Sequence, residues 1–196
     1  MGPAAGSSVN TIDPAERRFE QVYEDHFDAI FRYLLHRVAD VSLAEDLTAQ
    51  TFFKAYRAFP RFRHREGKVS SWLYRIATNE LNSHLRRPRT ASLEAGFGDV
   101  RVERENAERI LERHTAFLEV NQALRTLKPE DQALVALRYF EQKPFAEIAE
   151  ILGRSTRVLT VRTHRALTRL RRELDRRGMD HEGLRKALDR SAEAGC

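Results

Sequence analysis

The chain has 196 residues, of which 41% are hydrophobic and 32% are charged, and its formal net charge is +5 at pH 7. This length and composition favour small helical domains with exposed charged faces over one large core. A single cysteine, Cys196, excludes an intrachain disulfide and fits a reducing cytoplasm, and no apolar run is long enough for membrane insertion.

The amino-terminal part of the sequence predicts a disordered leader and then helices. Residues 1–15 begin without the basic and apolar regions of a signal peptide. Apolar residues then recur at spacings of three and four from Phe19 to Val38, which predicts an amphipathic helix. Ser42 and Glu45 form a capping box, which predicts that a second helix starts there.

The second helix is expected to stop near Pro60, where a basic loop begins. A third helix is predicted from about Ser71 to Arg86, with Pro88 shortly after its end. Together the three helices predict one helical bundle over residues 16–88.

The helical periodicity dissolves after this bundle and returns further along the chain. Proline, threonine, serine, glycine and mixed charges predict a linker over 89–109. Helical spacing resumes over 110–177, with Pro129 suited to the first turn of a helix. The tail 178–196 is either disordered or one more short helix. No strand pattern stands out, so the predicted fold is all-α, with two small helical domains joined by a flexible linker.

The segment 144–167 has the pattern of a helix-turn-helix. Gly153 lies where the chain must turn sharply, and glycine adopts positive φ readily. Ser155 can cap the second helix, which is rich in arginine. The second helix of such a unit usually enters the DNA major groove, although a solvated charged face is the plainer interpretation. The histidines are scattered and no ligand cluster has the spacing of a metal site, so neither a metal nor a cofactor is expected.

Three motifs in this order resemble the extracytoplasmic-function (ECF) group of bacterial sigma-70 family RNA polymerase sigma factors. They are Ala-Glu-Asp-Leu-Thr-Ala-Gln-Thr-Phe-Phe-Lys-Ala-Tyr (44–56), Ser-Trp-Leu-Tyr-Arg-Ile-Ala-Thr-Asn (71–79), and Phe-Ala-Glu-Ile-Ala-Glu-Ile-Leu-Gly (145–153) followed by Arg162, His164 and Arg165. The resemblance implies a sigma-2-like domain over 16–88 and a sigma-4-like domain over 110–177.

The resemblance also implies the partners. They are core RNA polymerase, through its clamp coiled coil and flap regions, promoter DNA, and an anti-sigma factor, all met in the cytoplasm by a protein that catalyses nothing. In the family the second helix of sigma-2 docks on the clamp. The residues expected to do so here are Glu45, Asp46, Gln50 and Phe53. The family commonly has glutamine and then an acidic residue where this chain has Ala49 and Gln50.

The basic loop and the third helix correspond to the part of the family that captures the −10 promoter element. Opening a duplex needs groups that reward an unstacked base, together with cations for the backbone and aromatic rings for stacking. By resemblance Asn79 is the candidate to hydrogen-bond a flipped base, and Trp72 either stacks on DNA or anchors the core. The full predicted set is Arg61, Arg63, His64, Arg65, Lys68, Trp72, Asn79, Arg86 and Arg87.

The second helix of the helix-turn-helix corresponds to the reader of the −35 element. Arginine can hold guanine through two hydrogen bonds, whereas phosphate contacts position the protein. The predicted set is Thr156, Arg157, Thr160, Val161, Arg162, His164, Arg165 and Arg169, of which Arg162 and Arg169 are expected on phosphate. The family's usual Gly-Thr-Val-Lys-Ser-Arg stretch is Arg-Val-Leu-Thr-Val-Arg at 157–162 here, which predicts an individual −35 preference.

Two other functions compete with this hypothesis. One is a dimeric helix-turn-helix regulator that binds a palindrome and uses the amino-terminal bundle as a sensor or dimerisation domain. The other is an enzyme acting on nucleic acid, which no carboxylate cluster, metal-ligand spacing or nucleophile–base pair supports. The basic loop beside Trp72 favours the sigma factor, because a simple duplex reader has no need to capture a base.

Overall fold

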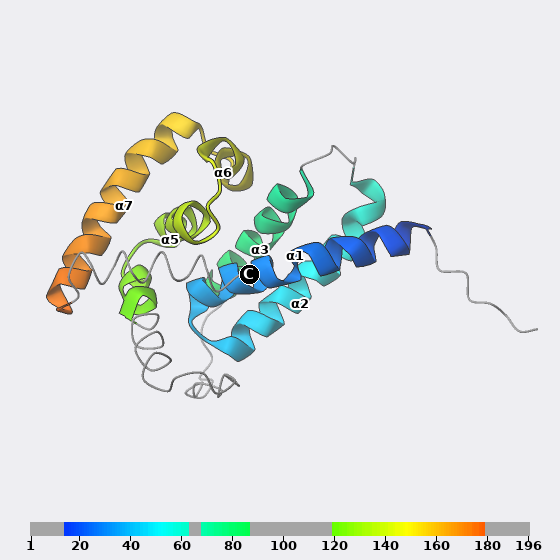
Figure 1. Cartoon of the computed structure of the whole chain (residues 1–196), viewed down its shortest axis with the longest axis horizontal. Helices are drawn as coiled ribbons and strands as arrows, with labels where there is room; N and C mark the ends of the chain where they lie inside the picture. The colour runs from blue at the N-terminus through cyan, green and yellow to red at the C-terminus, as the bar shows by residue number, and fades with distance from the viewer. Residues whose placement is uncertain (1–13, 63–67, 87–118, 179–196) are drawn as a thin grey trace, which may run out of the picture.

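A computed structural model of the chain describes residues 14–62, 68–86 and 119–178, and these residues form helices and short connections with no strand (Figure 1). The all-α prediction is confirmed. The predictions made for the leader up to residue 13, the linker 89–109 and the tail from 179 onward lie outside the described residues. The same holds for Arg63, His64, Arg65 and Arg87.

The first helical unit contains α1 (Pro14–Val38), α2 (Val41–Ala58), the 3₁₀ turn η1 (Phe59–Arg61) and α3 (Val69–Arg86). The predicted capping box at the start of α2 is wrong. Asp40, in an extended conformation, is the N-cap, and its carboxylate accepts the Leu43 N–H at 2.9 Å. Ala39 has a φ of 49°, so the chain reverses tightly and the cap lies two residues earlier than predicted.

Aromatic side chains hold the far end of α1 against α2. The Phe19 ring makes edge contacts with Tyr56 and Phe59, each with 5.2 Å between ring centroids, and with Phe52 at 6.5 Å. Phe19, Phe52 and Phe59 are buried. The three- and four-residue spacing of apolar groups along α1 therefore produces the packed face that the sequence predicts.

The second helical unit starts with a helical segment over residues 119–125. It continues with α5 (Pro129–Val135), the π-helical turn η2 (Ala136–Phe140), α6 (Phe145–Leu152) and α7 (Thr156–Arg176). Pro129 occupies the first turn of α5, as predicted. The π-helical turn was not predicted; in it the Glu141 N–H donates to the Ala136 carbonyl five residues earlier, at 3.1 Å.

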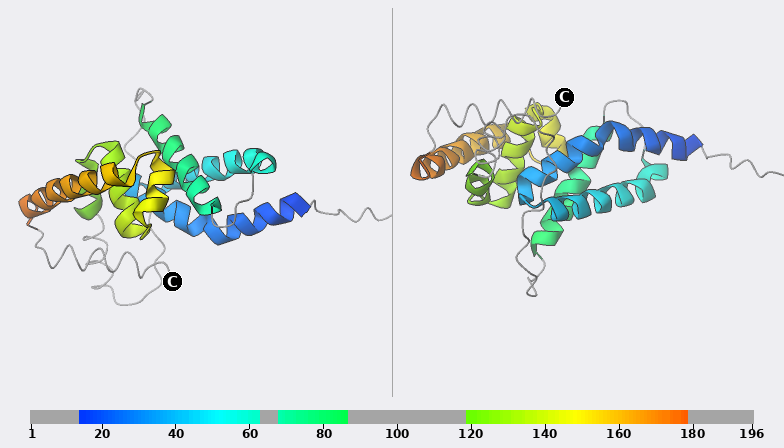
Figure 2. Two further views of the ribbon diagram at one scale, coloured as in Figure 1. Left: turned by 90° about the horizontal axis from the view of Figure 1, so that it is seen from above. Right: turned by 60° about the horizontal axis from the view of Figure 1, so that its bottom comes forward.

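The two units pack against one another through α3 with α6 and through α1 with η2 (Figures 1 and 2). Buried apolar residues of both units belong to one continuous core. At the α1–η2 contact the His36 ring stacks on Phe140, with 4.1 Å between ring centroids. Burial, with Arg32 nearby, lowers the pKa of His36 from 6.5 to about 4, against an opposing hydrogen bond with Asn121.

We expect His36 to make the stability of the chain depend on pH. Below pH 6.5 an exposed histidine binds a proton, whereas the packed His36 stays neutral until about pH 4. The stabilisation is therefore complete above pH 6.5 and is lost as the pH falls toward 4, by about 2 kcal/mol between pH 7 and pH 5. Chemical denaturation at both pH values measures it.

The control for this prediction is the exposed His84 on α3. His84→Gln should keep the pH dependence, and His36→Gln should reduce it. If His36→Gln does not fold, an NMR titration of the wild-type ring decides, and a His36 pKa near 6.5 would contradict the prediction.

Candidate nucleic-acid interface

The helix-turn-helix predicted from the sequence is formed by α6 and α7. Gly153 ends α6 in the left-handed conformation, with φ of 62°. Ser155 is the N-cap of α7, and its hydroxyl accepts the Val158 N–H at 3.4 Å. Ile148 and Leu159 are fully buried and join the two helices to the core. The local geometry of the turn is thus set by one glycine and one cap, as their residue types predict.

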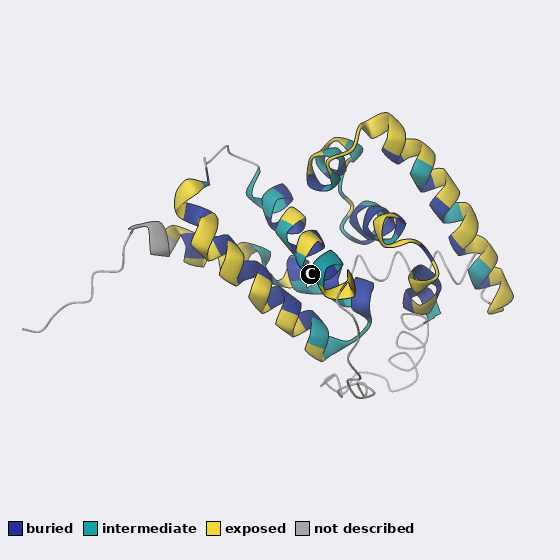
Figure 3. Ribbon diagram, turned by 180° about the vertical axis from the view of Figure 1, so that it is seen from behind, coloured by how far each residue is buried: buried dark blue, intermediate teal, exposed yellow. Residues whose placement is uncertain are grey.

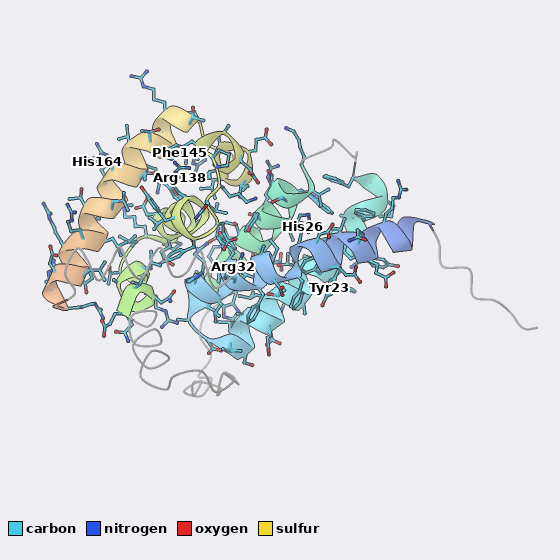
Figure 4. The ribbon with its side chains drawn as sticks, in the orientation of Figure 1. Tyr23, His26, Arg32, Arg138, Phe145 and His164 are labelled. Atoms are coloured by element: carbon cyan, nitrogen blue, oxygen red, sulfur yellow. The ribbon has the colours of Figure 1, made fainter. Side chains whose placement is uncertain are left out.

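One face of α7 is anchored and the opposite face is exposed (Figure 3). The buried stripe consists of Leu159, Thr163, Ala166, Leu170 and Leu174. Seven of the eight predicted DNA-binding residues of α7 are exposed: Thr156, Arg157, Thr160, Val161, His164, Arg165 and Arg169. Figure 4 shows His164 on the side of α7 that faces away from α5 and α6.

Arg162 makes ion pairs within the protein, although it was predicted to contact phosphate. Its Nε and Nη2 donate to one carboxylate oxygen of Asp131 on α5, at 3.0 and 2.8 Å, and Nη1 pairs with Glu130. The hydrogen bond from Arg162 lowers the pKa of Glu130. The Asp131 side chain is only 8% exposed. In this structure Arg162 therefore braces α7 on α5, while Arg169 stays exposed with Nη1 3.7 Å from Asp131.

Four of the nine residues predicted for the −10 element form a stripe along α3, whereas Arg61 lies on η1 and the other four lie outside the described residues. Lys68 directly precedes this helix, and Trp72, Asn79 and Arg86 follow at intervals of four, seven and seven residues, which return to one helical face. Asn79 and Arg86 are exposed. The Trp72 ring is half-buried and stacks on Phe62, with 4.4 Å between centroids. Trp72 is thus held by Phe62, which directly follows Arg61 of η1 at the start of the basic loop.

Arg75 belongs to the same stripe and was missed from the sequence. It lies seven residues after Lys68 and four before Asn79, a spacing that could have revealed it. In the structure Arg75 donates to the Glu150 carbonyl of α6, and Lys68 Nζ lies 2.7 Å from the Glu150 carboxylate. The helix-turn-helix therefore contacts the amino-terminal half of the stripe, while Arg75 stays exposed and Lys68 stays nearly half exposed.

A second set of polar contacts joins the units beside this stripe. The Tyr74 hydroxyl donates to the Glu141 carboxylate at 2.6 Å, and Arg32 Nη2 lies 3.7 Å from the same oxygen. Lys143 Nζ donates to the Ser70 hydroxyl at 2.8 Å. Burial raises the pKa of Glu141, and burial together with Glu141 raises that of Tyr74. Figure 4 shows Arg32 on the part of α1 nearest the second unit.

The residues predicted to bind core polymerase share the exposed face of α2. Glu45, Asp46 and Gln50 are exposed, and Phe53 is 61% exposed. Within the described part of the chain neither carboxylate has a basic partner. The only aromatic–cation contact of this face is with Arg57, whose guanidinium carbon lies 5.8 Å from the centre of the Phe53 ring. The exposed face of α2 thus presents a large aromatic group and two carboxylates to solvent.

Within residues 14–62, 68–86 and 119–178, no group of three or more histidine, cysteine, aspartate or glutamate side chains is placed to hold a metal ion. Among these residues, no helix has the length and apolar character needed to cross a membrane.

Comparison with known protein families identifies relatives of both units. The sequence model of sigma-70 region 2 matches residues 22–90, and that of sigma-70 region 4 matches residues 117–170. The chain is 32% identical to the ECF RNA polymerase sigma factor BldN of Streptomyces coelicolor, over 88% of this chain and 69% of BldN. It is 29% identical to the RNA polymerase sigma factor YlaC of Bacillus subtilis, over 79% of this chain and 91% of YlaC.

Solved structures with the same fold include sigma factors bound to other proteins. RpoE, in complex with the anti-sigma factor NepR from Bartonella quintana, has a TM-score of 0.60 at 20% identity, covering 81% of this chain and 98% of RpoE. CnrH, in complex with the cytosolic domain of CnrY, has a TM-score of 0.61 at 22% identity, covering 82% of this chain and 89% of CnrH.

The contrast between paired and exposed arginines on α7 leads to a stability prediction. Asp131→Asn should lower the unfolding free energy by about 1–3 kcal/mol. The reason is that it weakens a mostly buried contact in which Arg162 donates two hydrogen bonds to the Asp131 carboxylate. Arg165→Ala, at an exposed position of the same helix, should change it by less than about 0.5 kcal/mol. Thermal unfolding of both variants measures the difference, and equal effects would contradict the bracing role of Arg162.

Proposed function

This chain belongs to the extracytoplasmic-function group of the sigma-70 family of RNA polymerase sigma factors, and we propose that it directs polymerase to promoters by reading both the −10 and the −35 elements. The observation that carries the proposal is the presence on one chain of two separate exposed surfaces whose residues suit DNA. One is the outward face of α7, and the other is the α3 stripe with Trp72 and Asn79. A dimeric regulator needs only the first.

The α3 stripe supplies what strand opening requires. Unstacking a base takes a few kcal/mol, so the protein must offer the freed base compensating contacts. Asn79 presents an exposed amide that can donate and accept hydrogen bonds, and Trp72 presents an aromatic surface already oriented by Phe62. Lys68, Arg75 and Arg86 lie along the same face and suit the phosphate backbone. We assign the −10 element to this unit, over residues 16–88.

The second unit, over residues 110–177, is assigned to the −35 element. Its helix α7 has its amino-terminal turns exposed, and the N-terminal residues of a recognition helix contact base edges. Arg157 and Arg165 are exposed and can reach guanine edges or phosphate. Arg162 has the separate role of fixing α7 on α5, so the reading face is held rigidly.

The exposed face of α2 is assigned to core polymerase. Phe53 offers an apolar anchor, and Glu45 and Asp46 offer charge that selects a basic partner surface. The same face is the natural target of an anti-sigma factor, which would block polymerase by covering it. Copurification from native cells that recovers polymerase alone would count against such a factor. The protein itself catalyses no reaction and works in the cytoplasm, where polymerase and promoters meet.

The two units must separate when both promoter elements are bound. The elements are about 25 base pairs apart, which is about 85 Å of duplex at roughly 3.4 Å per base pair. In this structure Arg75 of α3 donates a hydrogen bond to the Glu150 carbonyl of α6, so the two helices are in direct contact. The 32 residues of 87–118 connect the units and span at most about 105 Å when fully extended, so the chain is long enough for the separation.

Run-off transcription from a genomic promoter library tests the proposed function. Core polymerase alone is compared with core polymerase plus this chain. Transcripts that start only when the chain is added, from sites sharing −35 and −10 motifs, are the expected result. No new start sites, together with binding to palindromes in the same library, would instead establish the dimeric regulator.

We also expect the free chain to bind −10 DNA more tightly when the cover on α3 is weakened. Glu150→Gln removes the negative charge that pairs with Lys68. Because the Lys68 and Glu150 side chains are both nearly half exposed, we expect the affinity for DNA to rise only about twofold to fivefold. The measurement is the affinity of the full chain for a single-stranded −10 oligonucleotide. Glu173→Gln, which alters contacts within α7, is the matched control and should change nothing. A lower affinity for Glu150→Gln would rule out a covering role.

A further inference from the structure

Two exposed valines lie on the reading face of α7 and have no role in the fold. Val158 is 45% exposed and Val161 is 49% exposed, and they are the two large exposed hydrophobic side chains among the described residues of the second unit. Val161 lies two residues after the buried Leu159, which places it on the opposite side of the helix. Neither side chain contributes to the core.

Helix propensity gives no reason for these residues either. β-branched side chains lose rotamer freedom in a helix, so valine at an exposed helical position is less favourable than alanine, arginine or glutamate by up to about 0.7 kcal/mol. Elsewhere the exposed positions of α7 are mostly arginine and other polar residues. Two unfavourable residues in the first two turns point to a contact outside the chain.

The surroundings of Val161 identify the kind of contact. The residues three and four positions away on either side of it are Arg157, Val158, His164 and Arg165, and all four are exposed. The valines therefore form a small apolar patch bordered by hydrogen-bond donors of a type that bind DNA. A small apolar patch bordered by cationic side chains matches a partner that carries a single apolar group on a polyanion. It matches a partner protein with a broad apolar surface less well.

In the DNA major groove the one apolar group on a base edge is the C5-methyl of thymine. We propose that Val158 and Val161 contact thymine methyl groups in the −35 element and thereby contribute to promoter choice. The Ser155 cap binds the Val158 N–H directly, so the position of the patch relative to the helix-turn-helix is fixed. This inference rests on the proposed function and adds to it that the −35 element contains at least one T·A pair facing this patch.

The test replaces thymine by deoxyuridine, which removes only the methyl group. Once the promoter library has given the −35 element, each thymine on either strand is replaced singly, and the affinity of the holoenzyme for the promoter is measured. At one or two positions wild-type holoenzyme should bind the uracil promoter about fourfold more weakly, the equivalent of about 0.8 kcal/mol for one buried methyl. The Val158→Ala, Val161→Ala double variant should bind both promoters equally.

The matched control is Arg165, an exposed arginine next to the valine patch. Arg165→Ala should weaken binding to both promoters and keep the sensitivity to the methyl group. Alanine favours a helix more than valine does, so the double variant should stay folded, which its thermal unfolding checks. A −35 element without T·A pairs, a wild-type protein insensitive to uracil, or a double variant that retains the sensitivity would each overturn the inference. Failure of the proposed function is distinguishable, because then no transcript depends on the chain at all.

Discussion

The polar part of the junction between the two helical units centres on one buried carboxylate, that of Glu141. Its side chain is 3% exposed, and its two partners, Tyr74 and Arg32, belong to the other unit. Because burial raises the pKa of Glu141, the packed state disfavours the very charge that its partners stabilise. Buried pairs of this kind add little net stability, since desolvation offsets attraction. These polar contacts therefore add geometric specificity, while the buried apolar residues that the two units share supply the adhesion.

In the packed arrangement the two proposed DNA-reading surfaces differ in how accessible they are to DNA. The outward face of α7 is open to solvent, whereas Lys68, just before α3, and Arg75, on α3, both contact Glu150. The acidic group that covers the stripe comes from the helix-turn-helix itself, and it occupies the same cations that suit a phosphate backbone. The second unit, which we assign to the −35 element, thus also contacts the surface that we assign to the −10 element. The exposed face of α2, which we assign to polymerase, belongs to neither surface.

Local chemistry explains which parts of this structure the sequence could predict. Gly153, Ser155 and Pro129 act through backbone conformation and capping, so their roles follow from residue type alone, and all three are confirmed. The cap at Asp40 was missed because Ser42 and Glu45 offered a stronger local pattern than a tight turn through Ala39. The ion pairs of Arg162 and the cover on Arg75 join residues more than 30 positions apart, and one sequence carries no signal for such pairings. The individual DNA and polymerase contacts remain predictions.

The distance between the two readers tests the account most directly. Spin labels at the exposed positions His84 on α3 and Asp175 on α7, in a chain with Cys196 replaced by serine, report that distance by pulsed electron resonance. We expect one distance in the free chain, equal to that of the structure, and an increase of several tens of ångströms when core polymerase and promoter DNA are added. An unchanged distance in a complex that transcribes would contradict it.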